Sequence, residues 1–69
     1  MNLVKFKKPK TKNDIARLPF VDKIVNEGED GYWVYLKEGY RSTRMECSTI
    51  HEPTIAECIE AINDGIERL

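Results

Sequence analysis

The chain has 69 residues, of which 41% are hydrophobic and 33% charged, and this composition is typical of one small globular domain. It contains no run of about 18 apolar residues and no apolar segment after its lysine-rich start, so we expect neither a transmembrane helix nor a secretory signal. Two cysteines in such a chain are expected to be free thiols. The sequence therefore predicts a cytoplasmic protein that does not bind membranes.

The formal net charge of −1 hides an uneven distribution of charge along the chain. Residues 1–19 contain six Lys or Arg and one acidic residue, which gives a net charge of +5. Residues 20–69 contain five Lys or Arg and eleven acidic residues, which gives a net charge of −6. We therefore expect a basic N-terminal arm attached to an acidic body.

The basic arm comprises residues 1–12 and precedes a predicted single α+β domain, residues 13–69. Its charge comes from five lysines, Lys5, Lys7, Lys8, Lys10 and Lys12. Two conformations are open to it. Leu3, Val4 and Phe6 predict a short edge strand, which the lysines and a proline would protect from further pairing; alternatively, the arm is disordered.

The domain is predicted to begin with a short helical turn and two strands. Asn13 is the expected N-cap of the turn, and Pro19 is expected to end it. Residues 20–26 and residues 32–36 are rich in β-branched and aromatic side chains, which favours strands. The glycines of residues 27–31 allow the chain to turn between them.

The second strand has apolar side chains on both of its faces. Its alternation places Tyr32, Val34 and Leu36 on one face and Trp33 and Tyr35 on the other. A single helix can cover only one face of a sheet. We therefore expect Trp33 and Tyr35 to lie under the arm or to be exposed.

The rest of the chain predicts a third strand and one long helix. A turn at residues 37–40 leads to a half-polar edge strand over residues 41–49, and residues 50–53 link this strand to the helix. The helix is expected over residues 54–69. Its apolar stripe repeats at intervals of 4, 3, 4 and 3 residues and consists of Ile55, Ile59, Ile62, Ile66 and Leu69.

The expected fold class is α+β, with a β-β-β-α order. Thr54 and Glu57 fit a capping box at the start of the helix. Because no second long helix is predicted, the apolar stripe must pack on the sheet. The prediction is a three-stranded antiparallel β-meander with the C-terminal helix packed on one face, and with an extra N-terminal strand or a short helical turn.

The residue types that could carry chemistry are sparse. The candidate metal-ligand group is Cys47, His51, Glu52 and Cys58, whose cysteines lie 4 and 7 residues from the histidine rather than in the close pairs of structural zinc sites. Cys47 and His51 would make a nucleophile–base pair, but no orienting residue is recognisable. No glycine-rich phosphate loop is present. We therefore predict no catalytic residues, no metal, no cofactor and no enzyme activity.

Binding is the remaining class of function. Exposed Trp33, Tyr35 and Tyr40 predict a surface that binds a protein partner or a second copy as a homodimer, with electrostatic help from Lys7, Lys8 and Lys10. The alternative is nucleic-acid binding, with the aromatic residues as stacking groups. The phosphate-binding residues would then be Lys5, Lys7, Lys8, Lys10 and Lys12. The negative charge of the body disfavours this alternative.

Two stretches of the chain carry a resemblance to known proteins. The runs WVYLKEGY at residues 33–40 and IHEPTIAE at residues 50–57 resemble a group of short uncharacterised bacterial, phage and mobile-element proteins. That resemblance implies a phage or mobile-element origin and brings no known activity.

The same region is more distantly similar to the small domain of HicB-type antitoxins. The matching residues are Gly31, Tyr32, Val34, Thr54, Glu57 and Ile62. Residues 37–40 replace the Pro-Asp-Leu-Pro-Gly turn of that family, so the resemblance implies the β-β-β-α fold more than the role. An antitoxin-like binding domain is accordingly a further alternative.

Overall fold

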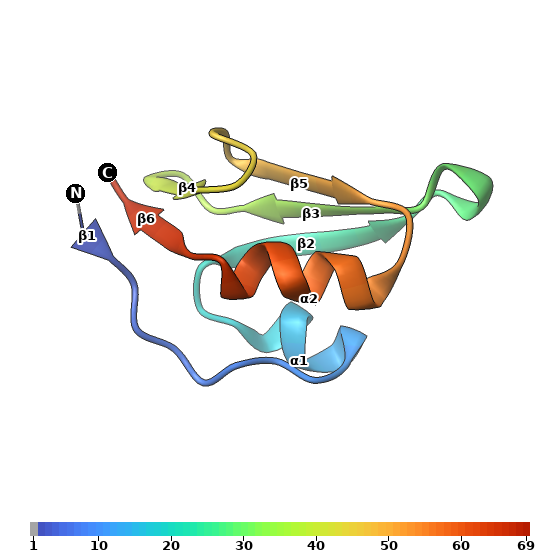
Figure 1. Cartoon of the computed structure of the whole chain (residues 1–69), viewed down its shortest axis with the longest axis horizontal. Coiled ribbons are helices and arrows are strands. Elements are labelled where there is room, and N and C mark those ends of the chain that lie inside the picture. The colour runs from blue at the N-terminus through green and yellow to red at the C-terminus, as the bar shows by residue number, and fades with distance from the viewer. Residues whose placement is uncertain (1) are drawn as a thin grey trace.

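The computed structural model describes residues 2–69, in which six antiparallel strands form two three-stranded sheets (Figure 1). The elements in chain order are β1 (Asn2–Leu3), α1 (Lys12–Arg17), β2 (Val21–Asn26), the 3-10 turn η1 (Gly28–Asp30), β3 (Tyr32–Leu36), β4 (Tyr40–Ser42), β5 (Thr49–Glu52), α2 (Ile55–Asn63) and β6 (Ile66–Arg68). The main sheet has the order β2-β3-β5, and the small sheet has the order β1-β6-β4. The predicted α+β class is confirmed, whereas a single three-stranded sheet describes only part of the fold.

The main sheet is covered on one face, which we call the inner face. Ile24 of β2, Val34 of β3 and Ile50 of β5 are paired across the sheet on this face. Val34 and Ile50 are fully buried in the core, which also includes side chains from α1 and α2. Both helices lie on this same side of the sheet (Figure 1). The hydrophobic core of the protein therefore lies between the main sheet and the two helices.

Helix α2 begins where the sequence predicts and ends earlier. The Thr54 hydroxyl accepts a hydrogen bond from the Glu57 N–H at 3.1 Å, but the Glu57 carboxylate accepts from that hydroxyl rather than from the Thr54 N–H. Gly65, with φ of +135°, takes the chain out of the helical conformation. The predicted helix over residues 54–69 is thus wrong at its C-terminal end, where the chain forms β6.

The apolar stripe of the predicted helix is divided between two elements. Ile62 is fully buried on α2, together with the small side chains of Cys58 and Ala61. Ile66 is also fully buried, but it lies in β6, and Leu69 beyond it is 78% exposed. No helix in residues 2–69 has the length and apolar character needed to span a membrane.

The predicted third strand, residues 41–49, is also wrong, because the chain reverses within it. Its start belongs to β4 in the small sheet, and its last residue opens β5 in the main sheet. The Ser42 N–H donates to the Cys47 carbonyl at 2.8 Å, and the Met45 N–H donates to the Ser42 hydroxyl at 3.2 Å. These bonds close a turn over residues 43–46. Strand β5 therefore occupies the segment that was expected to be a linker.

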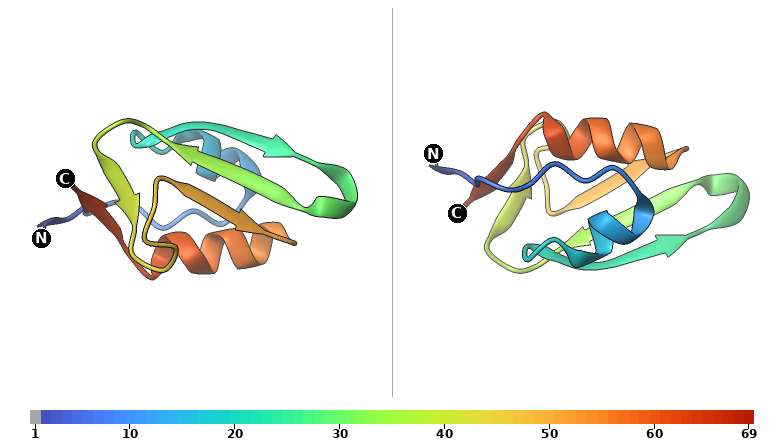
Figure 2. Two further views of the ribbon diagram at one scale, coloured as in Figure 1. Left: turned by 90° about the horizontal axis from the view of Figure 1, so that it is seen from above. Right: turned by 90° about the horizontal axis from the view of Figure 1, so that it is seen from below.

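The N-terminal residues pack against the body. The Val4 N–H donates to the Ile66 carbonyl at 2.8 Å, which extends the pairing of β1 with β6. The Phe6 ring meets the Phe20 ring edge-on at 5.1 Å between centroids, and Pro9 is buried. The chain from β1 to α1 therefore runs across the helical side of the molecule (Figure 2, right).

The short helix α1 is capped by a residue that the sequence interpretation missed. Thr11, rather than Asn13, is the N-cap. Its hydroxyl accepts from the Asp14 N–H at 3.1 Å, and the Asp14 carboxylate accepts from the Thr11 N–H at 3.2 Å. This reciprocal capping box satisfies two backbone donors at the start of the helix. It fixes where the arm ends and α1 begins.

Candidate interaction surface

The outer face of the main sheet is the surface opposite the helices. Its side chains form two rows across β2, β3 and β5: Val25, Trp33 and His51 in one, and Lys23, Tyr35 and Thr49 in the other. No other element of residues 2–69 lies over this face in the view from above (Figure 2, left). Trp33 and Tyr35 are each partly exposed there.

Aromatic rings on the outer face stack on one another. The Trp33 and His51 rings are nearly parallel, with centroids 3.9 Å apart and an interplanar angle of 10°. The Tyr35 ring is also nearly parallel to that of Trp33, with centroids 6.3 Å apart and an interplanar angle of 16°. The Lys23 ammonium is 5.1 Å from the centroid of the Tyr35 ring, which is within cation–π range. The result is a surface with aromatic rings on its central strand and the polar residues Lys23 and Thr49 on the strands beside it.

His51 completes this surface, although the sequence interpretation placed it in a linker. Its Nε2–H donates to the Asp30 carbonyl in the β2–β3 hairpin, and this bond holds the ring against Trp33. The place of His51 on the outer face follows from the pairing of β5 with β3. The alternation along β3 predicts Trp33 and Tyr35 on this face, and the strand pairing adds Val25, Lys23 and Thr49.

Tyr40, the third predicted contact residue, lies elsewhere. It belongs to β4 in the small sheet, and its ring centroid is 6.0 Å from that of Phe20. It packs against the hydrophobic core together with Val4. The structure thus brings Trp33 and Tyr35 together on one face and places Tyr40 apart from them, because the chain leaves the main sheet after β3.

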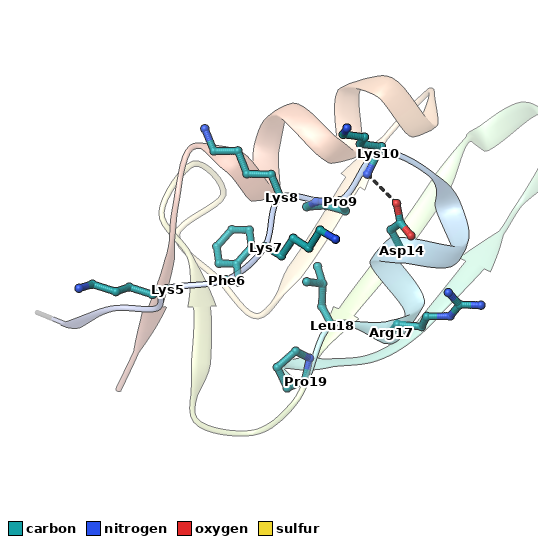
Figure 3. Close-up of a pocket in the computed structure, with 10 residues that line it drawn as sticks. All are labelled: Lys5, Phe6, Lys7, Lys8, Pro9, Lys10, Asp14, Arg17, Leu18 and Pro19. Carbon is teal, nitrogen blue, oxygen red and sulfur yellow. Dashed lines mark hydrogen bonds between the residues drawn. The ribbon is translucent and has the colours of Figure 1, made fainter.

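The lysines of the arm lie on the helical side of the molecule, away from the outer face. Four of them line a cavity beside α1: Lys5, Lys7, Lys8 and Lys10 (Figure 3). Lys12 is the first residue of α1, and its ammonium is 5.9 Å from the centroid of the Tyr32 ring. The lysines of the arm and Trp33 therefore do not form one continuous surface on the same side of the molecule.

The cysteine and histidine residues of the candidate metal group do not converge. His51 is on the outer face, whereas Cys58 is fully buried in the core on the other side of the main sheet. Burial raises the pKa of the Cys58 thiol to about 11. Cys47 is exposed, and its thiol donates to the Thr49 carbonyl at 3.1 Å. Within residues 2–69 no three His, Cys, Asp or Glu side chains are grouped as metal ligands would be.

The acidic side chains around α2 have a structural role. Arg44, in the turn between β4 and β5, pairs with Glu52 and Glu60 at 3.8 Å and donates from Nε to Asp64. The bond to Asp64 raises the pKa of Arg44. These contacts tie the turn to α2, so the carboxylates do not form a site of their own.

The comparisons with known proteins identify no relative. A scan against protein-family models matched no family, and searches of curated proteins and of solved structures gave no significant match. The functional argument therefore depends on the geometry of this chain.

Proposed function

We propose that the protein is a non-enzymatic interaction domain that binds another protein, either a second copy of itself or a different partner, through the outer face of the main sheet. The observation that supports this most directly is the stack of Trp33 on His51 beside Tyr35, on a face that nothing else in residues 2–69 covers. Aromatic side chains combine a large apolar area with few rotatable bonds. Such residues account for much of the binding free energy at protein interfaces.

The charges around the outer face favour a protein over a nucleic acid. Lys23 is the single cationic side chain in its two rows, and the neighbouring hairpin carries the acids Glu27, Glu29 and Asp30. This hairpin projects beyond the end of the sheet (Figure 1). A phosphate backbone laid across the stack would meet these acids and be repelled. The alternative function is nucleic-acid binding by the lysines of the arm, in which no base would stack on the aromatic rings of the outer face.

Self-association is the simplest form of this proposal. A chain of 69 residues buries a small core, and association with a second copy would bury the apolar centre of the outer face as well. A different partner would use the same residues. Both forms require Trp33, because it is the central ring of the stack.

Size-exclusion chromatography with light scattering, run on matched variants, tests the proposal. Trp33→Ser removes the central ring, and Leu69→Ser removes a large hydrophobic side chain that is 78% exposed but lies outside the outer face. We expect a dimer for the wild type and for Leu69→Ser, and a monomer for Trp33→Ser. Loss of a central tryptophan typically costs about 2 kcal/mol or more of binding free energy, a roughly thirtyfold change in affinity.

The same variants cover the case of a different partner. If the wild type is a monomer, affinity capture from host extract should retain a protein on the wild type and on Leu69→Ser and lose it on Trp33→Ser. Circular dichroism must show that Trp33→Ser is folded. A folded Trp33→Ser variant that keeps both the oligomeric state and the captured protein of the wild type would refute the proposal.

A further inference from the structure

A second surface, on the helical side of the molecule, has the composition of a binding site for an anion. The cavity of about 460 Å³ between the arm and α1 is lined by ten residues (Figure 3). Five of them are cationic: Lys5, Lys7, Lys8, Lys10 and Arg17. Four are apolar: Phe6, Pro9, Leu18 and Pro19. Asp14 is the one acidic residue of the lining.

The positive charge of this cavity is only partly neutralised by the protein. None of the five cations forms a salt bridge within residues 2–69. The Asp14 carboxylate accepts from the Lys10 and Thr11 N–H groups, and the bond from Lys10 is the main cause of its lowered pKa. With Asp14 counted, the lining carries a net charge of +4, from five cations and one anion. The clustered cations repel one another, and an anion bound among them would relieve that repulsion.

The walls of the cavity are fixed by the fold. Phe6 packs edge-on against the buried Phe20, and Leu18 is 8% exposed, so the apolar part of the lining is anchored in the core. Pairing of β1 with β6 holds one end of the arm, and the capping box of Thr11 and Asp14 holds the other. The cavity is therefore largely preformed.

The cationic side chains point in different directions around the cavity (Figure 3). In Figure 3, Lys7 extends across the space between the arm and Leu18, whereas Lys5, Lys8 and Arg17 point outward around it. Lysine side chains have flexible four-carbon stems, so the outer ammonium groups can fold inward onto a ligand. Lys7 is the residue best placed to contact one directly.

We propose that this cavity binds a nucleoside phosphate, with the phosphates against the lysines and the base against the apolar lining. A net charge of +4 favours a polyvalent anion over a single carboxylate. Ammonium groups bind phosphates as point charges. The volume lies within the range of about 300–1,000 Å³ typical of small-molecule sites. The same chemistry is offered by a free nucleotide and by a nucleotide unit of a nucleic-acid strand.

Isothermal titration calorimetry at about 20 mM salt, where electrostatic interactions are weakly screened, tests this site. The probes are ATP without divalent cations, inorganic tripolyphosphate, adenosine and a single-stranded oligonucleotide of about eight nucleotides. We expect ATP to bind more tightly than tripolyphosphate and adenosine not to bind, because the charge supplies most of the affinity and the apolar lining adds to it. Binding of the oligonucleotide more tightly than ATP would identify a strand as the source of the nucleotide.

Matched variants separate a defined site from diffuse attraction. Lys7→Gln should weaken ATP binding roughly two- to fivefold, the range for one exposed charge pair, and Lys7→Gln with Arg17→Gln should weaken it further. Lys23→Gln makes the same charge change on the outer face and should leave ATP binding unaltered. Trp33→Ser should also leave it unaltered, which keeps this result independent of the proposed protein interface. No saturable binding of ATP up to about 1 mM, checked by equilibrium dialysis where the titration gives no heat, or equal weakening by Lys7→Gln and Lys23→Gln, would overturn the proposal.

Discussion

Substitution of Gly31 tests the junction of the β2–β3 hairpin with the end of β5. Gly31 has φ of +88° and ψ of −142°, a region that is essentially restricted to glycine. A Cβ added there would lie 2.5 Å from the Glu52 carbonyl oxygen and 2.7 Å from the Pro53 Cα, both of which are backbone atoms. Gly28, in the same hairpin, has φ of +64°, and an added Cβ would meet nothing within 4 Å. The two glycines therefore separate backbone strain from a steric clash.

The expected costs follow from these distances. Gly31→Ala should lose about 1–3 kcal/mol from the backbone conformation and about 1–3 kcal/mol more from the clash. Gly28→Ala should lose only about 1–2 kcal/mol, from the left-handed conformation. A domain of this length has a free energy of unfolding of roughly 3–10 kcal/mol, so Gly31→Ala should lose about half or more of it.

Urea unfolding followed by far-UV circular dichroism measures both variants. The wild type should have the highest urea midpoint, Gly28→Ala a moderately lower one, and Gly31→Ala the lowest. The dependence of the unfolding free energy on urea concentration should be the same for all three proteins. Equal loss of stability in the two variants, within about 0.5 kcal/mol, would show that the hairpin does not meet β5 at Glu52. It would also favour the linker that the sequence predicts for residues 50–53.

Four further predictions concern single residues. Thr11→Ala should cost about 1 kcal/mol by removing the cap of α1, and an unchanged thermal midpoint would exclude that cap. A thiol reagent should label Cys47 rapidly and Cys58 only when the protein opens; equal rates would contradict burial of Cys58. Because the folded pKa of Cys58, about 11, lies above its ordinary value of 9.0, its contribution to stability is full below pH 9 and is lost as the pH rises toward 11. Alkaline loss of stability should therefore be smaller in Cys58→Ala. Glu67, 4% exposed, accepts from Arg41 at 2.8 Å, so Glu67→Gln should cost about 1–3 kcal/mol in urea unfolding; wild-type stability would refute the importance of this pair.

The sequence predicts those strands and helix ends that are determined by residues close together in the chain. Strands β2 and β3 follow from β-branched and aromatic runs, and the N-terminus of α2 follows from Thr54. The end of α2 does not follow, because Ile62 and Ile66 continue the helical spacing across Gly65. Pairing of β6 with β1 and β4 decides that end, and this pairing joins residues far apart in the sequence.

The candidate surface likewise contains residues that local patterns predict and residues whose place depends on long-range pairing. Alternation along β3 is sufficient to put Trp33 and Tyr35 on one face opposite the buried Val34. The place of His51 depends on the register between β3 and β5, which a short polar strand does not reveal. The position of Tyr40 depends on the chain's change from one sheet to the other. The cavity beside α1 was not foreseeable, because it requires the docked path of the arm.

Fluorescence of Trp33, the single tryptophan of the chain, measures the central claim most directly. Its ring lies on the outer face, so its emission reports on contact there without any label. We predict that emission shifts to shorter wavelength, and that acrylamide quenching weakens, as the protein concentration is raised through the dimerisation range or as a captured partner is added. An assembled complex in which the emission and quenching of Trp33 equal those of the isolated chain would contradict the account.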